Sequence, residues 1–242
     1  MVVAALQIAG IGRAQAADVR GLIVSDLRTT LSAQISGTID AITVDMGDTF
    51  KSGQVLVRVK DDIYRTQLAR LEAELRSTRQ QLDANRKLKE LNSIGTLDVL
   101  QSEALVKQKE SERHLYEIQW RQCTLKAPFP GRVVERLASP HQFVTPGTPL
   151  LDIIDDKHLS VQAFVPSHWI RSLRPGQRCM LYVDEIGMTF SARVTSLGAR
   201  IDANSQMLEV RAAIEDRSPQ LLAGMSGQLD FGDLIPGDAV HE

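Results

Sequence analysis

Residues 63–122 read IYRTQLARLEAELRSTRQQLDANRKLKELNSIGTLDVLQSEALVKQKESERHLYEIQWRQ. This stretch holds no proline and one glycine, Gly95, whereas all nine prolines of the chain lie at or beyond Pro128. Its apolar residues recur at steps of three and four, as on one face of a helix. They are Leu68, Leu71, Leu75 and Leu82, then Leu97, Leu100, Ala104, Leu115 and Ile118. The pattern predicts two long antiparallel helices that meet along this narrow seam.

The helical pattern breaks at residues 92–96, Asn-Ser-Ile-Gly-Thr. Gly95 can adopt the left-handed conformation that often ends a helix, and Asp98 with Gln101 fits the start of the next helix. Asp61 or Asp62 is expected to cap the first helix. We therefore expect a helical hairpin over residues 61–123 with its tip near residue 94.

The segments on either side of the hairpin repeat one another at a shift of 94 residues. The shift carries Ala33, Gly37, Gly53, Leu56, Asp61 and Asp62 onto Ala127, Gly131, Gly147, Leu150, Asp155 and Asp156. The pattern of each half predicts several short strands. The glycines are expected at turns that need positive φ: Gly37, Gly47, Gly53, Gly131 and Gly147. Neither half could bury its apolar face alone, so the halves should pack together and hold the hairpin's ends close.

Residues 157–232 show alternating apolar residues separated by turn signals. The predicted strands are residues 159–165, 179–183, 188–197, 207–214 and 228–231, and residues 20–31 are expected to add another. Several short strands at regular spacing indicate a small β-barrel.

Composition narrows the possible functions. The chain has 242 residues, a formal net charge of −2 and two cysteines, Cys123 and Cys179. With this small net charge, the chain has no overall positive electrostatic field that would attract nucleic acid. Two cysteines support neither a disulfide framework nor a cysteine-rich zinc site. The five histidines lack metal-binding spacing, and no catalytic cluster or phosphate-binding loop is present. We expect no cofactor, no metal and no enzyme activity.

The first residues have the pattern of an export signal. An apolar run over residues 2–12 precedes Ala14-Gln15-Ala16, an A-x-A cleavage pattern, and is shorter than the ~20 residues that span a bilayer. We predict a signal peptide at 1–17 that directs export from the cytoplasm.

These motifs together resemble the periplasmic adaptor family of tripartite efflux pumps, also called membrane fusion proteins. The resemblance rests on AQISGTIDAITVDMGDTFKSGQVLVRV (residues 33–59), the hairpin, LKAPFPGRVVERLASPHQFVTPGTPLLDI (residues 125–153), and LSVQAFVPSHWIRSLRPGQ with the later LLAGMSGQLDF. It implies a mainly β fold: a lipoyl-like domain split by an antiparallel coiled coil, followed by a small β-barrel. Where the family usually has a turn glycine in the second half, this chain has His141.

The resemblance divides the chain into five parts. They are a signal peptide at 1–17, a β-barrel from 18–32 and 157–232, a lipoyl-like domain from 33–60 and 124–156, the hairpin at 61–123, and a short tail at 233–242 where a membrane-proximal domain would begin. Ile63 takes the place of the lysine that carries lipoate or biotin in lipoyl-type domains. This supports a structural role for the lipoyl-like domain.

The resemblance also implies partners. In the family the hairpin tip engages an outer-membrane channel through a basic residue, a leucine four positions later and a small polar residue seven beyond that. The match is partial: Leu91 fits the leucine, Lys87 takes the basic place where arginine is common, and Asp98 stands where serine is usual. Arg86 is adjacent to Lys87, and Gly95 lies in the loop. The expected partners are an inner-membrane transporter, an outer-membrane channel and further copies of the chain in a ring. The resemblance also implies a periplasmic location, in association with the inner membrane through the transporter.

Three functions remain open from the sequence. The first is an adaptor for small-molecule export by a resistance-nodulation-division pump. The second is an adaptor for an ATP-driven exporter, and the third is a periplasmic scaffold that no longer docks a pump. The acidic pairs Asp61-Asp62 and Asp155-Asp156 are expected to serve as a helix cap and a turn rather than a carboxylate site.

Overall fold

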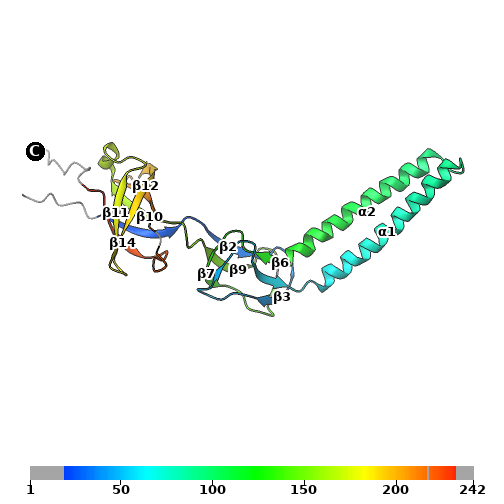
Figure 1. The fold of residues 1–242 in the computed structure, drawn as a ribbon, viewed down its shortest axis with the longest axis horizontal. Coiled ribbons are helices and arrows are strands. Elements are labelled where there is room, and N and C mark those ends of the chain that lie inside the picture. Colours follow the sequence, from blue (N-terminus) through cyan, green and yellow to red (C-terminus); the bar gives the residue numbers. More distant parts are fainter. Residues whose placement is uncertain (1–18, 217, 233–242) are drawn as a thin grey trace, which may run out of the picture. The chain divides into compact units, whose positions relative to one another are not determined.

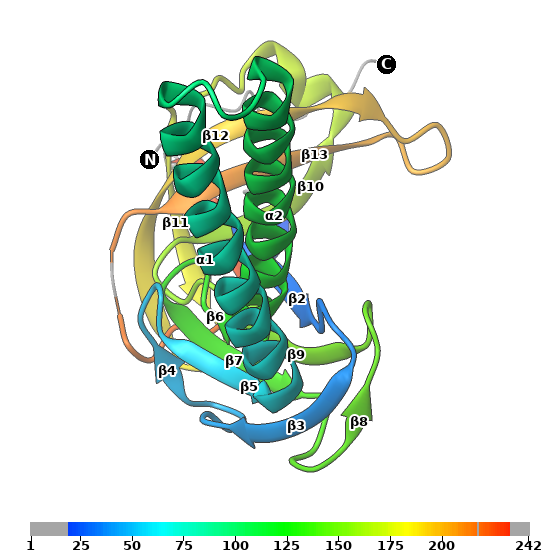
Figure 2. The ribbon, with the colours of Figure 1, turned by 90° about the vertical axis from the view of Figure 1, so that its right-hand side faces the viewer.

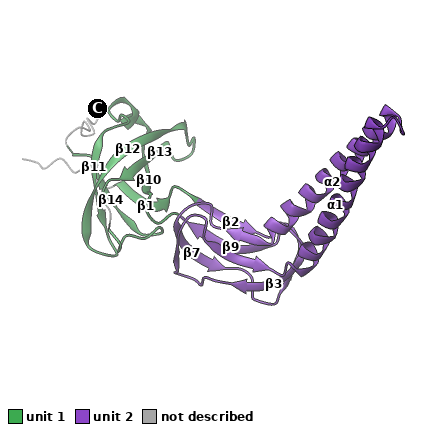
Figure 3. Cartoon of the chain, turned by 45° about the vertical axis from the view of Figure 1, so that its right-hand side comes forward, with its two compact units in different colours: residues 1–27, 155–242 green, residues 28–154 purple. Residues whose placement is uncertain are grey.

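The structure is a computed structural model that describes residues 19–216 and 218–232. Two compact units, residues 1–27 with 155–242 and residues 28–154, account for the chain (Figure 3). The predicted signal peptide at 1–17 and the tail at 233–242 lie outside the described residues. The predicted fold class, mainly β with a long helical hairpin, is confirmed (Figure 1).

The first unit is a closed antiparallel barrel of six strands around one apolar core. Its strand order is β1-β10-β13-β12-β11-β14, and residues such as Ile23, Val161 and Leu181 point inward and are fully buried. The strands are β1 (Val19–Ser25), β10 (Leu159–Pro166), β11 (Arg178–Val183), β12 (Met188–Ile201), β13 (Met207–Ile214) and β14 (Ser226–Asp230), with a 3₁₀ helix η1 (Ser167–Arg171) after β10. The alternation of buried and exposed residues seen in the sequence therefore corresponds to the inner and outer faces of this barrel.

The predicted barrel segment 18–32 is wrong in its last five residues. Arg28–Ser32 form β2, which pairs with β9 (Pro149–Ile154) in the second unit, and only β1 joins the barrel. Arg28 also holds Asp152 of β9 through an ion pair of 2.6 Å. The short turn between β1 and β2 divides one apparent strand between two sheets.

The second unit contains two four-stranded sheets that the 94-residue shift relates to one another. One sheet has the order β2-β9-β7-β4 and the other β6-β5-β3-β8. The remaining strands are β3 (Gly37–Ile42), β4 (Thr49–Phe50), β5 (Val55–Val59), β6 (Thr124–Lys126), β7 (Gly131–Arg136) and β8 (Phe143–Val144). The shift carries β3 onto β7 and β4 onto β8 residue for residue. Each sheet mixes strands from both halves, which confirms that the two halves pack together.

The turn glycines have two different roles. Gly47, Gly53 and Gly147 have φ values of 87°, 77° and 91°, the left-handed region predicted for them. The prediction is wrong for Gly37 and Gly131, which start β3 and β7 and do not have positive φ. A Cβ on Gly37 would lie 2.6 Å from Val59 Cγ1, so close packing and not backbone conformation requires glycine there.

The helices α1 (Asp62–Glu90) and α2 (Thr96–Gln122) lie side by side along the hairpin (Figures 1 and 2). Leu71, Leu75 and Leu82 of α1 are buried, as predicted. The predicted face of α2 is wrong. Val99 and Val106, seven residues apart, are buried against α1, while Leu97, Leu100, Leu115 and Ile118 are exposed. A seven-residue spacing keeps both valines on one side of a helix, which is the geometry of a coiled-coil seam.

This correction gives a stability prediction. Val106→Ala should lower the free energy of unfolding by about 1.5 kcal/mol, because it opens a cavity in the seam. Leu115→Ala should change it by less than about 0.5 kcal/mol, because Leu115 is 54% exposed. Urea unfolding in dilute solution, followed by circular dichroism, measures both. A larger loss of unfolding free energy for Leu115→Ala than for Val106→Ala would support the seam predicted from the sequence, in which Leu115 faces α1.

His141 occupies the turn position that Gly47 occupies in the other half. Its φ is 67°, and its N–H donates to the Ile39 carbonyl at 2.9 Å, as the Gly47 N–H donates to the Val133 carbonyl at 2.9 Å. A left-handed residue other than glycine costs about 1–2 kcal/mol of backbone energy, although histidine tolerates this region better than most residues.

His141→Gly should therefore raise the free energy of unfolding by about 0.5 kcal/mol, since relief of strain exceeds the added entropy of the unfolded chain. Gly47→Ala is the matched control at φ 87°, and should lower it by about 1 kcal/mol. Chemical denaturation midpoints compare the two. A His141→Gly protein less stable than the parent would mean that the histidine side chain makes a stabilising contact that outweighs the strain.

Candidate functional site

The loop between the helices forms the tip of the hairpin, and its backbone is fixed by local hydrogen bonds. The Asn92 N–H donates to the Lys89 carbonyl at 2.9 Å and the Ser93 N–H to the Leu88 carbonyl at 2.8 Å. Asn92 has φ 53°, so the residue that ends α1 in the left-handed region is Asn92 and not Gly95 as predicted. Asparagine can occupy this region because its short polar side chain tolerates it.

Gly95 has instead an extended conformation, with φ −81° and ψ 165°, and is the N-cap of α2. Its N–H donates to the Asp98 Oδ2 atom at 3.0 Å. Asp98 is thus the third residue of α2, where a carboxylate also interacts favourably with the helix dipole. The predicted helix start at Asp98 is wrong by two residues, because α2 begins at Thr96. The Asp98 carboxylate instead stabilises the loop through its hydrogen bond with the N-cap residue Gly95.

The tip has three apolar side chains, one partly buried and two exposed. Ile94 packs against the seam cluster of Leu75, Leu82, Val99 and Val106. Leu91, at the end of α1, is 73% exposed, and Leu97, at the start of α2, is 66% exposed. The chain therefore has one exposed leucine before the loop and one after it.

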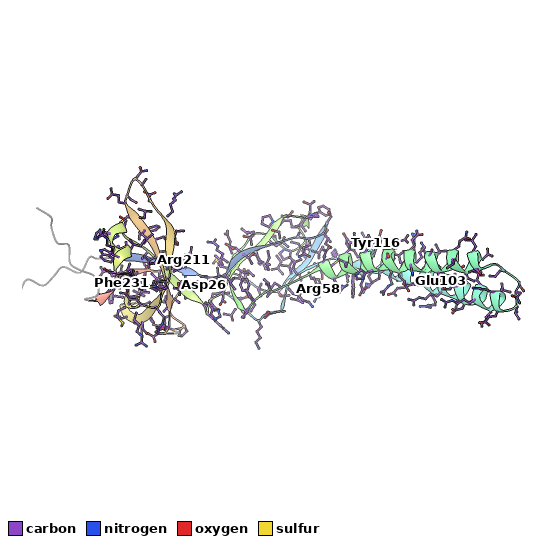
Figure 4. The ribbon with its side chains drawn as sticks, turned by 90° about the horizontal axis from the view of Figure 1, so that it is seen from above. Asp26, Arg58, Glu103, Tyr116, Arg211 and Phe231 are labelled. Atoms are coloured by element: carbon purple, nitrogen blue, oxygen red, sulfur yellow. The ribbon has the colours of Figure 1, made fainter. Side chains whose placement is uncertain are left out.

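The basic residues of the tip differ in their bonding. Arg86 Nη2 lies 3.0 Å from Glu103 Oε1 on α2, so this guanidinium is engaged across the hairpin; Figure 4 labels Glu103. Lys87 and Lys89 lie in the last turn of α1, and the described part of the chain gives neither an ion pair. Of the two basic residues predicted for partner contact, Lys87 is available and Arg86 is already paired.

Hydrogen bonds join the base of the hairpin to the two-sheet unit. The Trp120 Nε1–H donates to Asp61 Oδ2 at 2.8 Å, which ties the end of α2 to the residue before α1. Asp61 is the N-cap of α1 by position but makes no side-chain cap. The Tyr64 hydroxyl donates to the Ser36 carbonyl at 3.0 Å, and Cys123 is buried beside it. Both helix ends are thereby fixed to the sheets.

The second acidic pair is part of a turn. The Asp155 carboxylate is 3% exposed, accepts hydrogen bonds from the Lys157 and His158 N–H groups, and lies 2.6 Å from His158 Nδ1. Burial raises the pKa of Asp155, but the hydrogen bonds from His158 and the two backbone N–H groups outweigh burial, and the net pKa lies below the usual range.

Because its folded-state pKa is lowered, Asp155 stabilises the barrel unit above the usual aspartate pKa of about 4, and this contribution is lost as the pH falls through the folded value. Asp155→Asn should therefore cost about 1–2 kcal/mol at pH 7 and much less at pH 2.5. Asp40→Asn, at an exposed position of β3, should cost little at either pH. Urea unfolding of the three proteins at both pH values checks this. A cost for Asp155→Asn that stays constant with pH would show that the carboxylate charge contributes nothing.

The described residues show little that could support covalent or metal chemistry. Both cysteines are free, and burial raises the pKa of each thiol to about 11, which leaves the unreactive protonated form at neutral pH. No group of three or more His, Cys, Asp or Glu side chains that could hold a metal ion occurs in residues 19–216 and 218–232. Within the same residues, no helix is long and apolar enough to cross a membrane.

Known proteins share the architecture. Residues 160–234 match a family model described as "CusB-like, beta-barrel domain". A chimeric MacA–MexA protein that contains the Pseudomonas aeruginosa MexA α-hairpin domain superposes with a TM-score of 0.78 at 19% identity, covering 88% of this chain and 78% of that one. The chain carries a CusB-like β-barrel domain and has the fold of membrane fusion proteins, also called periplasmic adaptors. A putative efflux transporter from Bacteroides eggerthii has the same fold, with a TM-score of 0.72 at 22% identity, covering 88% of this chain and 67% of that chain.

Two named proteins, NolF and MdtN, are similar to this chain in sequence. The nodulation protein NolF of Rhizobium meliloti is 28% identical over 226 residues, which cover 87% of this chain and 61% of NolF. The multidrug resistance protein MdtN of Escherichia coli is 30% identical over 100 residues, 40% of this chain and 29% of MdtN. An uncharacterised Haemophilus influenzae protein matches 86% of this chain and 55% of its own length. The chain thus spans little more than half of the longest-matching curated relatives.

Proposed function

We propose that this adaptor links an inner-membrane transporter to an outer-membrane channel in the periplasm and takes part in the export of small molecules. The observation that carries the proposal is the hairpin tip, where Leu91 and Lys87 are exposed and unpaired among the described residues at the end of a helix of 29 residues. At 1.5 Å per residue such a helix extends about 44 Å. The adaptor architecture and the names of MdtN and the Bacteroides protein support an efflux role.

The adaptor contributes geometry in this proposal, and the transporter contributes energy. The barrel and the two-sheet unit have cores built mainly from aliphatic side chains, and at the tip the Asp98 carboxylate is engaged in a helix-end hydrogen bond with the Gly95 N–H. We propose that the chain is not an enzyme, and that a resistance-nodulation-division pump is its transporter. The family model matched by the barrel supports that class.

We also propose that several copies associate through the hairpins. Leu100, Leu115 and Ile118 lie on the side of α2 away from the seam and are exposed. They alternate with polar residues such as Lys107 and Ser111, as at helix surfaces that pack against a second hairpin. Burial of these side chains by a neighbouring copy would explain why α2 carries apolar residues on two faces.

The tip gives the test of the channel contact. The double change Leu91→Asp and Lys87→Glu should reduce co-purification of an outer-membrane protein with the full chain at least tenfold, because a charge enters the apolar contact and a neighbouring charge is reversed. The matched control is Leu105→Asp with Lys107→Glu, which makes the same changes at exposed residues in the middle of α2.

Quantitative mass spectrometry of detergent extracts measures recovery, and circular dichroism shows that both variants remain folded. Equal recovery of the outer-membrane protein by the tip variant and the parent would contradict the proposal. An equal loss by the control would show that the tip is not the site of contact.

A further inference from the structure

The two sides of α2 differ in a way that apolar burial alone does not explain. The side that faces α1 contributes two buried apolar residues, Val99 and Val106. The remaining surface of α2 carries four larger apolar residues that are exposed: Leu97, Leu100, Leu115 and Ile118. Because larger apolar side chains gain more from burial, apolar burial alone would turn these four residues toward α1. Another interaction therefore selects the side of α2 that packs in the seam.

Polar side chains of the two helices meet across the seam. The Asn85 Nδ2 atom donates to Ser102 Oγ at 2.6 Å, and both residues are half-buried. The Ser102 hydroxyl in turn donates to the Asp98 carbonyl at 2.9 Å. Ser102 is thus both an acceptor and a donor in this packing. If an apolar side chain of α2 took the place of Ser102, the Asn85 amide would lose this partner, which is costly for a half-buried donor.

Two ion pairs accompany this hydrogen bond. Arg86 Nη2 lies 3.0 Å from Glu103 Oε1, and Arg79 Nη2 lies 2.6 Å from Glu110 Oε1; Figure 4 labels Glu103. The two arginines are seven residues apart on α1, and the two glutamates are seven residues apart on α2. The buried valines of α2 have the same spacing. The ion pairs and the valines therefore follow one seven-residue repeat, which is the repeat of a coiled coil.

The root of the hairpin does not by itself fix this orientation along the whole of α2. A straight α-helix departs from a seven-residue repeat by about 20° in each repeat. Val99 lies three such repeats from Trp120, whose hydrogen bond to Asp61 lies at the root. Without contacts that follow the repeat, the side of α2 that faces α1 would rotate by roughly 60° between the root and Val99. Contacts between the helices near the tip are needed to keep Val99 in the seam.

We propose that the Asn85–Ser102 hydrogen bond and the two arginine–glutamate pairs select the side of α2 that packs on α1 in the half of the hairpin near the tip. Asn85, Arg79 and Arg86 are positioning residues, and their effect is to keep Leu97 and Leu100 out of the seam. This selection is a property of the single chain, so it does not depend on the partners proposed above.

Thiol labelling of two adjacent positions tests the orientation of α2. A cysteine is introduced into the full chain by Val99→Cys or by Leu100→Cys, at positions that are 6% and 54% exposed. The Leu100→Cys protein should react with a maleimide at least tenfold faster than the Val99→Cys protein. The chain without either change gives the background rate, which is low because burial raises the pKa of both native thiols to about 11.

The reversed variant combines Asn85→Leu, Arg79→Glu and Arg86→Glu, which removes the hydrogen bond and places like charges opposite each other across the seam. In this variant, the labelling rate at position 100 should fall at least threefold and the rate at position 99 should rise at least threefold. The rescue variant keeps Asn85 and exchanges the charges of both pairs, and should return both rates to within twofold of the parent. Its changes are Arg79→Glu, Arg86→Glu, Glu103→Arg and Glu110→Arg.

Asn85→Leu alone is the milder variant, and should shift both rates at least twofold in the same directions as the reversed variant. Circular dichroism verifies that each variant remains helical. A rise at position 99 without a fall at position 100 would mean that the seam has opened and that the polar contacts select no side, which would overturn the inference. Unchanged rates in a folded reversed variant would show that the root alone orients α2, and would also overturn it.

Discussion

The pairing of β5 with β6 is the interaction on which the hairpin depends. β5 leads into α1 and β6 follows α2, and the two strands pair antiparallel, with Val57 opposite Leu125 and Arg58 opposite Thr124. The Val59 N–H donates to the Cys123 carbonyl at 2.8 Å, and the Trp120–Asp61 hydrogen bond lies one step further along. These contacts hold the two helix ends side by side, so the helices begin at a spacing that lets their seam close.

The seam itself is thin. Its buried cluster has one leucine or valine about every two turns of each helix. Of the ion pairs beside it, Arg79–Glu110 at 2.6 Å is exposed and Lys109–Glu74 at 2.9 Å is half-buried. Exposed ion pairs contribute at most about 1 kcal/mol each. Two helices joined by such a seam would associate weakly as separate chains, but closure at the root removes most of the entropy cost of bringing them together. Because the seam buries few apolar residues, leucines on the outer faces of the helices and at the tip remain available for contact with other molecules.

Much of this structure could be predicted from the sequence because it rests on local spacing. The 94-residue repeat located both halves of the two-sheet unit, and alternation located the barrel strands, since both depend only on which residues face inward. The face of α2 could not be predicted. Two sets of apolar residues in α2 have helical spacing: Leu97, Leu100, Leu115 and Ile118, and Val99 with Val106. Packing against α1 determines which of the two sets is buried. Three further features could not be predicted from the sequence. Asn92, and not Gly95, has the left-handed conformation at the end of α1. Arg86 forms an ion pair with Glu103, and β2 pairs with β9 outside the barrel. The Arg86–Glu103 pair and the pairing of β2 with β9 depend on partners brought close by the fold, whereas the Asn92 turn depends on local hydrogen bonds to Lys89 and Leu88.

The proposed function requires that one chain contact proteins of both membranes. Chemical crosslinking in intact cells, with mass-spectrometric identification of everything joined to this protein, detects both contacts in one experiment. We expect recovery of an inner-membrane transporter of the resistance-nodulation-division class together with an outer-membrane channel protein, the latter linked to residues of the hairpin. Recovery of an ATP-driven exporter in place of that pump would keep the bridge and change its source of energy. Recovery of neither membrane protein, from a chain shown to be exported and folded, would contradict the account and favour a periplasmic scaffold.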